Sequence, residues 1–246
     1  MHPRKHQTIL PCVMLLAGIL GMVLRLLLNT DCLDQRQLLP AMHPLGMASG
    51  LVAVAALALA FCSARKQEKL EGDCPDFPGS RLAFLGHLLA ASGILLTVAG
   101  SVPAATAGLG LVWKALGFVS VPCLAAAGWF RLRGKQPFFL LHLVPSVFLV
   151  VHTITQYQIW SSDPQLLNYI FSLFGVICML FFTFYYSAYD AGLPWRRRLI
   201  FFALASVCLG LMALPGCSYP WLYLGITLWA LMELPSQTVS KEGDEK

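Results

Sequence analysis

The feature that most constrains this chain is a series of eight apolar segments, each long enough to form a helix that crosses a bilayer. A helix of about 20 apolar residues spans the hydrocarbon core of a membrane, whereas helices of soluble cores are shorter and amphipathic. Only 12% of the residues are charged, which is about half of the fraction usual in soluble domains. The sequence therefore predicts an all-α, polytopic integral membrane helical bundle.

The predicted bundle is a single domain over residues 1–234, followed by a short polar cytoplasmic tail, 235–246. The eight expected transmembrane helices cover residues 7–28, 44–63, 81–102, 108–130, 138–160, 164–189, 197–214 and 219–234. The last segment is the shortest. A re-entrant or peripheral arrangement of it would leave the sidedness of the preceding loops unchanged.

The basic residues predict which ends of the helices lie in the cytoplasm. Cytoplasmic loops of membrane proteins carry an excess of Lys and Arg. If the N-terminus is cytoplasmic, fourteen of the 17 Lys and Arg residues fall on the cytoplasmic side, while Arg25 and Lys114 lie within helices near the outer surface. This pattern predicts a multi-pass protein of the cell membrane with both termini in the cytoplasm.

The eight cysteines form no C-x-x-C pair and no Cys/His spacing typical of a zinc site. Only Cys32 and Cys217 fall in predicted outer loops. An oxidising exterior would allow these two residues to form a disulfide. The alternative is two unpaired cysteines in loops.

Polar residues recur at helical spacing along segments 138–160 and 164–189, which a short turn joins into an antiparallel hairpin. The hairpin and its cationic neighbours predict an outward-facing pocket for a small polar or anionic solute or a lipid headgroup. The alternative for the two cations is that they extend to the headgroups. The candidate ligand-binding residues are His152, Gln156, Asn168, Ser172, Arg25 and Lys114.

His87 and His142 lie at similar depth, about 9–10 Å inside the predicted cytoplasmic boundary at ~1.5 Å per residue. Two imidazoles at equal depth could ligate haem or a metal ion. The alternative is a hydrogen bond from each imidazole across helices. Asp190 and Glu233 lie at predicted cytoplasmic helix ends, where we expect solvation or salt bridges with the arginines at 196–198.

Three short stretches resemble one group of bacterial proteins. They are WSSDPQLLNY at residues 160–169, YDAG at 189–192 and RRR at 196–198. They resemble uncharacterised multi-pass membrane proteins of clostridial-type Gram-positive bacteria. The resemblance implies a bacterial plasma-membrane location and carries no activity.

Three classes of function remain compatible with these patterns. The first is the binding or transport of a small polar or anionic solute or lipid headgroup, and the second is a structural or regulatory subunit that docks another membrane protein. The third is a haem- or metal-dependent redox protein. No nucleophile elbow, HExxH or Walker A motif is present in the sequence, so no enzyme activity and no cofactor are predicted. Basic residues do not cluster with aromatic residues in a soluble module, which argues against a nucleic-acid partner and leaves the lipid bilayer as the expected environment.

Overall fold

The computed structural model describes residues 3–31, 43–65, 79–100, 107–160 and 166–238. Within these ranges the chain forms eight α-helices and no strand, joined by turns where the connections are described. The helices are α1 (Pro3–Asp31), α2 (Pro44–Arg65), α3 (Arg81–Gly100), α4 (Ala107–Leu132), α5 (Leu140–Trp160), α6 (Leu166–Asp190), α7 (Arg196–Ala213) and α8 (Pro220–Thr238).

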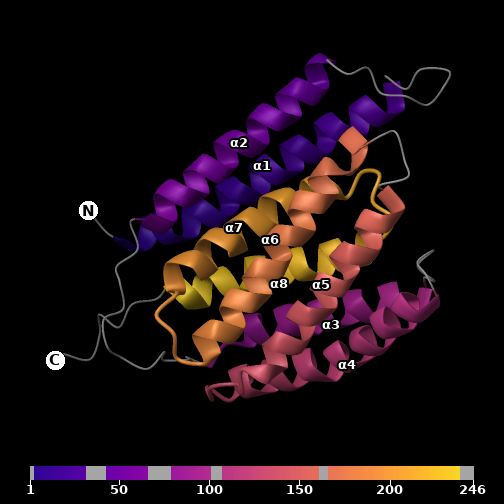
Figure 1. Ribbon diagram of the computed structural model, residues 1–246. Coiled ribbons are helices and arrows are strands. Elements are labelled where there is room, and N and C mark those ends of the chain that lie inside the picture. Colours follow the sequence, from indigo (N-terminus) through magenta and orange to yellow (C-terminus); the bar gives the residue numbers. More distant parts are fainter. Residues whose placement is uncertain (1–2, 32–42, 66–78, 101–106, 161–165, 239–246) are drawn as a thin grey trace.

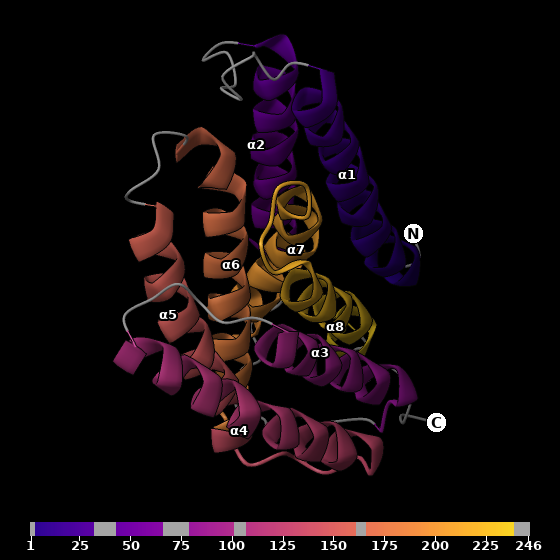
Figure 2. The same cartoon turned by 90° about the vertical axis from the view of Figure 1, so that its right-hand side faces the viewer.

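Helices α7 and α8 lie at the centre of the bundle. Figure 2 shows them between the α1–α2 pair on one side and the α3–α4 pair on the other, with α5 and α6 along the flank. Helix α7 contacts α1, α2, α6 and α8, and every one of its residues from Ala203 to Ala213 is buried. It has no amphipathic pattern because protein surrounds it on all sides.

The peripheral helices expose apolar side chains, as expected of a surface that faces lipid. On α1, Leu16 and Leu20 are exposed, and on α2, Leu51 and Val54 are exposed. Among the described residues, the six helices α1–α6 are long and apolar enough to cross a membrane. Helices α7 and α8 do not meet these criteria of length and hydropathy. Helix α7 begins with three arginines and α8 carries Glu233. The described part of the chain is therefore a helical bundle of membrane type with six candidate spans.

Close packing between α3 and α8 depends on small residues. A Cβ atom on Gly93 would lie 2.4 Å from the carbonyl oxygen of Trp221, and one on Gly225 would lie 2.8 Å from that of Leu89. Both distances are below van der Waals contact, so these two positions accept only glycine without a shift of the backbone. Small residues of this kind allow helices in membranes to approach closely.

The helices run in alternating directions, which gives the bundle two ends (Figure 1). We call the end where α3, α5 and α7 begin and where α4, α6 and α8 end the inner end, and the opposite one the outer end, after the sidedness expected from the basic residues. Helix α8 continues through Pro235 to Thr238, beyond the end expected at Leu234. A proline removes one backbone donor, and here the helix extends by only one turn beyond it.

Candidate functional site

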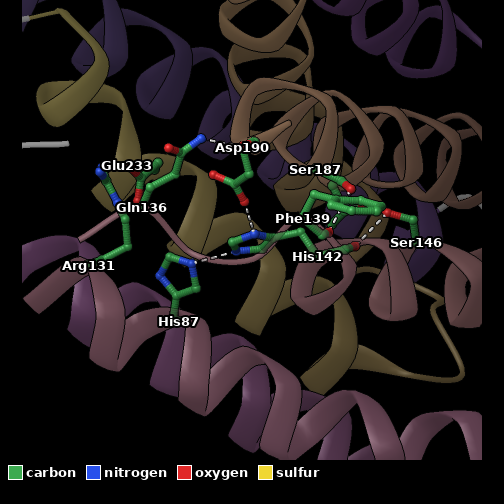
Figure 3. A network of polar contacts seen from close by, with 10 residues as sticks. His87, Arg131, Gln136, Phe139, His142, Ser146, Ser187, Asp190 and Glu233 are labelled. Carbon is green, nitrogen blue, oxygen red and sulfur yellow. Dashed lines mark hydrogen bonds and ion pairs between the residues drawn. The ribbon is translucent and has the colours of Figure 1, made fainter. Parts of the chain in front are cut away.

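Five helices bring buried ionisable and aromatic side chains together at the inner end. We call this group the inner cluster, and part of it is shown in Figure 3. Each of its members is at most 4% exposed. The inner cluster consists of His87 on α3, Arg131 on α4, His142 on α5, Tyr186 and Asp190 on α6, and Trp229 and Glu233 on α8.

A chain of three hydrogen bonds links α6, α5 and α3 within this cluster. Oδ2 of Asp190 lies 2.5 Å from Nδ1 of His142. Nε2 of His142 lies 2.9 Å from Nε2 of His87, and Nδ1 of His87 lies 2.7 Å from the carbonyl oxygen of Ala83, one turn earlier on α3. In Figure 3 dashed lines join the Asp190 carboxyl to the His142 ring and the His142 ring to the His87 ring. We call these residues the Asp–His–His chain.

The local sequence places Asp190 at this position by ending α6 directly after it. Gly192 adopts a left-handed conformation with φ of 84°. The amide of Leu193 donates to the carbonyl of Ala188 and the amide of Gly192 donates to that of Tyr189. These bonds form the Schellman arrangement that commonly terminates a helix at glycine. The last turn of α6 therefore presents the Asp190 carboxyl toward the first turn of α5.

A buried ion pair connects α4 with α8 beside the chain. Nη2 of Arg131 lies 2.5 Å from Oε1 of Glu233, and both side chains are 1% exposed. Aromatic rings fill the space around the imidazoles, with centroid distances of 4.4 Å from His142 to Tyr186 and 4.8 Å from His87 to Trp229. Burying two charges costs several kcal/mol per ion, and the cost is offset when the charges are paired.

Neutral hydrogen bonds extend the contact between α5 and α6. The hydroxyl groups of Ser146 and Thr183 are 3.0 Å apart, and Oγ of Ser187 donates to the carbonyl of Phe139 at 2.8 Å. The Gln136 amide donates to the backbone carbonyl of Asp190. The inner halves of α5 and α6 thus face each other through polar groups.

The geometry of the two histidines is that of a hydrogen bond. A metal ion between two imidazoles needs about 4 Å between the ligating atoms, since each bond to nitrogen is about 2.0 Å long. The observed 2.9 Å between the Nε2 atoms leaves no room for one. In the described ranges, no group of three or more His, Cys, Asp or Glu residues could hold a metal ion. Of the two expectations for His87 and His142, the structure has the hydrogen bond across helices.

A second group of polar side chains lies among aromatic rings at the outer end. His152 is fully buried, and its Nδ1 accepts a hydrogen bond of 3.0 Å from Nε1 of Trp113. The ring of Tyr219 packs edge-on against His152 with centroids 5.1 Å apart. Gln156, one turn further along α5, is 2% exposed and lies beside the Tyr219 hydroxyl.

Polar side chains of α1, α6 and α8 lie at the same end of the bundle. The Arg25 guanidinium is buried, donates to the carbonyl of Met212 and lies 4.8 Å above the ring of Phe171. The Tyr223 hydroxyl donates to the carbonyl of Ser172 at 2.8 Å. We call the following residues the outer cluster: Arg25, Trp113, His152, Gln156, Phe171, Ser172, Tyr219 and Tyr223.

The remaining predicted site residues fall outside the outer cluster. Lys114 follows Trp113 on α4, is partly exposed, and makes no hydrogen bond or ion pair with the residues that the structure describes. Asn168 lies in the first turn of α6, but its side chain is outside the described part of the structure.

The predicted disulfide also involves a residue that is not described. Cys32 lies outside the described residues, so its pairing with Cys217 stays a prediction. Cys217 occupies the turn between α7 and α8, where its sulfur accepts a hydrogen bond from the Tyr219 amide. Burial raises the pKa of the Cys217 thiol to about 11. A thiol held in its protonated form reacts slowly with oxidants.

Sequence reasoning missed part of the inner cluster. Asp190 and Glu233 are buried, so the expected solvation of their carboxyl groups was wrong. The expected alternative was salt bridges with the arginines at 196–198, and the structure shows ion pairs with His142 and Arg131. Both lie at helix ends, where a charge normally reaches water, and the sequence holds no signal that pairs α4 with α8. The only available signal was that each is an acidic residue adjoining an apolar segment.

The comparisons with known proteins found no relative. No family model, no curated protein and no solved structure matches this chain. The resemblance to clostridial-type membrane proteins therefore stays a prediction, and the function has to be argued from the geometry.

Proposed function

We propose that this is an integral membrane protein whose eight helices all cross the bilayer, with both termini in the cytoplasm, and whose outer cluster binds a small polar or anionic solute. Helices α7 and α8 have 18 and 19 residues and pack along helices that qualify as spans. The distribution of Lys and Arg supports the orientation. A C-terminal epitope reached by antibody in intact cells would contradict it.

The observation that carries the solute site is the buried Nε2 atom of His152. The indole of Trp113 can only donate, so Nδ1 of His152 must be the acceptor of their hydrogen bond. A neutral imidazole that accepts at Nδ1 carries its proton on Nε2. This N–H group is buried and has no hydrogen-bond partner in the described residues. A buried donor without an acceptor costs about 1–3 kcal/mol, and a ligand oxygen would remove that cost.

Other residues of the outer cluster suggest the chemistry of the ligand. The Ser172 hydroxyl is also buried without a hydrogen-bond partner among the described residues. Arg25 adds a fixed positive charge at the same end of the bundle. The rings of Trp113 and Tyr219 supply apolar walls. Donors, one cation and aromatic walls suit a small molecule or lipid headgroup that carries a carboxylate, phosphate or carbonyl oxygen.

Burial of this site suggests a role in transport rather than surface recognition. His152 is fully buried, so a solute reaches its Nε2 atom only when the outer ends of the helices separate. Opening and closing of helix ends around a central solute is how many membrane carriers work. Lys114 has no place in the proposed site, because it is partly exposed on another face of α4.

A thermal-shift experiment on the purified protein in detergent tests the solute site. The probes are inorganic phosphate, acetate, glycine and glycerol 3-phosphate, and nanodiscs of anionic lipid serve as the source of headgroups. We expect at least one probe to raise the Tm of the wild type, and we expect this rise to be lost in His152→Phe and reduced in Ser172→Ala.

Lys114→Met is the matched control, since it removes a cation from the same region without touching the outer cluster. Each variant is compared with its own sample without probe, so a lower starting Tm does not affect the comparison. The proposal fails if no probe shifts the wild type, or if His152→Phe and Lys114→Met respond alike.

A structural or regulatory subunit is the second candidate function. It is favoured by the inner cluster, where the Asp–His–His chain and the Arg131–Glu233 pair join five helices through contacts made within the protein. Such contacts hold a bundle together without any ligand. The redox alternative has less support, because the imidazoles of His87 and His142 are hydrogen-bonded to each other.

A further inference from the structure

We infer that the Asp–His–His chain is a binding site for one exchangeable proton inside the membrane domain. The chain consists of Asp190, His142 and His87 and ends at the carbonyl oxygen of Ala83. This inference is independent of the solute site at the outer end. It rests on counting the hydrogens that the observed contacts require.

One end of the chain has a fixed hydrogen position. A carbonyl oxygen only accepts, so Nδ1 of His87 must carry the hydrogen in its 2.7 Å contact with Ala83. The 2.9 Å contact between the two Nε2 atoms and the 2.5 Å contact between His142 and Asp190 each need one hydrogen as well. Without a hydrogen, two lone pairs would face each other at these distances.

The three contacts therefore hold three hydrogens. Two neutral imidazoles and an ionised carboxylate supply only two, so the chain binds one proton more than these groups carry separately. The additional proton can lie on the Asp190 carboxyl, on His142 as an imidazolium beside the carboxylate, or on His87 after a second hop. All three arrangements have a net charge of zero, and no bond other than those to hydrogen changes between them.

The surroundings favour this neutral state. Among the described residues, the charged groups that face the chain from the other helices are Arg131 on α4 and Glu233 on α8, which pair with each other. The remaining titratable neighbours are Tyr186 and Tyr189 on α6, and Arg196 on α7 lies beyond Tyr189. An ionised carboxylate buried without a compensating charge is strongly disfavoured in such an interior. The additional proton removes that uncompensated charge.

Loss of the proton has a structural consequence. The chain would then hold two hydrogens for three contacts, so one of the contacts has to open. Two of the three contacts join different helices, α6 to α5 and α5 to α3. Deprotonation would loosen one of these two helix contacts or turn the His87 ring away from Ala83. The site thus couples a proton to the packing of the inner end.

Stability against pH measures the bound proton. In the unfolded chain Asp is ionised above about pH 4 and His is neutral above about pH 6.5, so the folded protein binds one more proton than the unfolded chain. Stability therefore falls as the pH rises, by a factor of ten in the unfolding equilibrium per pH unit. The fall begins above about pH 6.5 and ends when the folded chain itself loses the proton.

The decisive comparison uses Asp190→Asn. An asparagine amide can donate to Nδ1 of His142, which leaves three filled contacts between neutral groups and nothing to titrate. We expect the wild type to lose about a hundredfold more stability than Asp190→Asn between about pH 7 and 9, or ~2.7 kcal/mol. Reversible unfolding in mixed micelles measures this difference. The cysteines and the α-amino group are the same in both proteins, so their contributions to the pH dependence cancel in the difference.

Tyr186→Phe is the control, because it keeps the ring against His142 and should retain the pH dependence of the wild type. A second measurement needs no variant. Weakly buffered wild-type protein at about pH 7.5, where few His and Cys side chains change charge, should release about one proton per chain on unfolding, as an indicator dye reports. Parallel pH profiles of wild type and Asp190→Asn, or unfolding without proton release, would overturn the inference.

Discussion

The two ends of the bundle use the same kinds of side chain in opposite ways. At the inner end, His142 and His87 bond to each other and to Asp190, and Arg131 is paired with Glu233. At the outer end, His152 accepts a hydrogen bond from Trp113 at one nitrogen and has no partner among the described residues at the other. Both sets of residues are almost completely buried.

This difference separates what holds the protein together from what is available to a ligand. Polar groups in a membrane interior stabilise a bundle only when donors meet acceptors. At the inner end, the two imidazoles and the Oδ2 atom of Asp190 meet that condition and, on the hydrogen count, do so by holding a proton. Oδ1 of Asp190 and Nε1 of Trp229 have no hydrogen-bond partner among the described residues. The outer end has buried polar atoms without protein partners among the described residues, which is the arrangement expected where a ligand supplies the missing contacts.

The largest effect is expected from breaking the inner ion pair. Arg131→Met leaves the Glu233 carboxylate buried next to an apolar side chain, and loss of one partner of such a pair costs about 3–5 kcal/mol. Unfolding in mixed micelles measures the loss. The double variant Arg131→Met/Glu233→Leu should recover most of it, since no charge is then buried. A loss below about 1 kcal/mol in the single variant, the range of exposed pairs, would contradict the view that the inner end depends on pairing.

An intermediate effect is expected from Trp113→Phe at the outer end. This change keeps an aromatic ring beside His152 and removes the donor to its Nδ1 atom, so the free energy of unfolding should fall by about 1–3 kcal/mol. Trp129→Phe on the same helix is the control, because Trp129 is exposed and should change stability by less than about 0.5 kcal/mol. Equal effects of the two changes would show that the hydrogen bond to His152 contributes nothing.

The smallest changes in stability are expected from removing one buried serine hydroxyl at each end, and these two variants compare the ends most directly. Ser172→Ala removes a buried hydroxyl without a partner among the described residues and should leave the stability unchanged or raise it by up to about 1 kcal/mol. Ser146→Ala removes a hydroxyl that is bonded to the carbonyl of His142 and to Thr183, and should lower stability by about 1 kcal/mol. Stability changes of opposite sign in the two variants would support the contrast between the ends. A loss of stability in both variants would contradict it.

Part of this arrangement follows from the amino-acid sequence alone. The polar spacing on 138–160 and 164–189 predicted that these segments share a polar seam, and Ser146 faces Thr183 in the structure. The equal depth of His87 and His142 predicted that they could meet, and their Nε2 atoms are in contact. Both inferences use only helix geometry and distance from the membrane boundary, which are properties of single segments.

Other parts depended on which helices are neighbours. The pair Arg131–Glu233 joins residues 102 positions apart, and no periodicity within α4 or α8 indicates that these helices meet. The same limit applies to α7, whose complete burial from Ala203 to Ala213 reflects its place between four neighbours rather than any pattern of its own. The residues of the outer site also depend on which helices are neighbours. The structure adds Trp113, Tyr219 and Tyr223 to the predicted residues and excludes Lys114.

The sequence by itself determined the helices, because backbone groups in a bilayer must be satisfied within each segment and an apolar run of sufficient length then folds locally. Only the tertiary structure decided which buried polar atoms find partners. That outcome depends on the facing surfaces of distant segments, where the packing of small residues such as Gly93 and Gly225 sets which helices approach and which side chains they bring together.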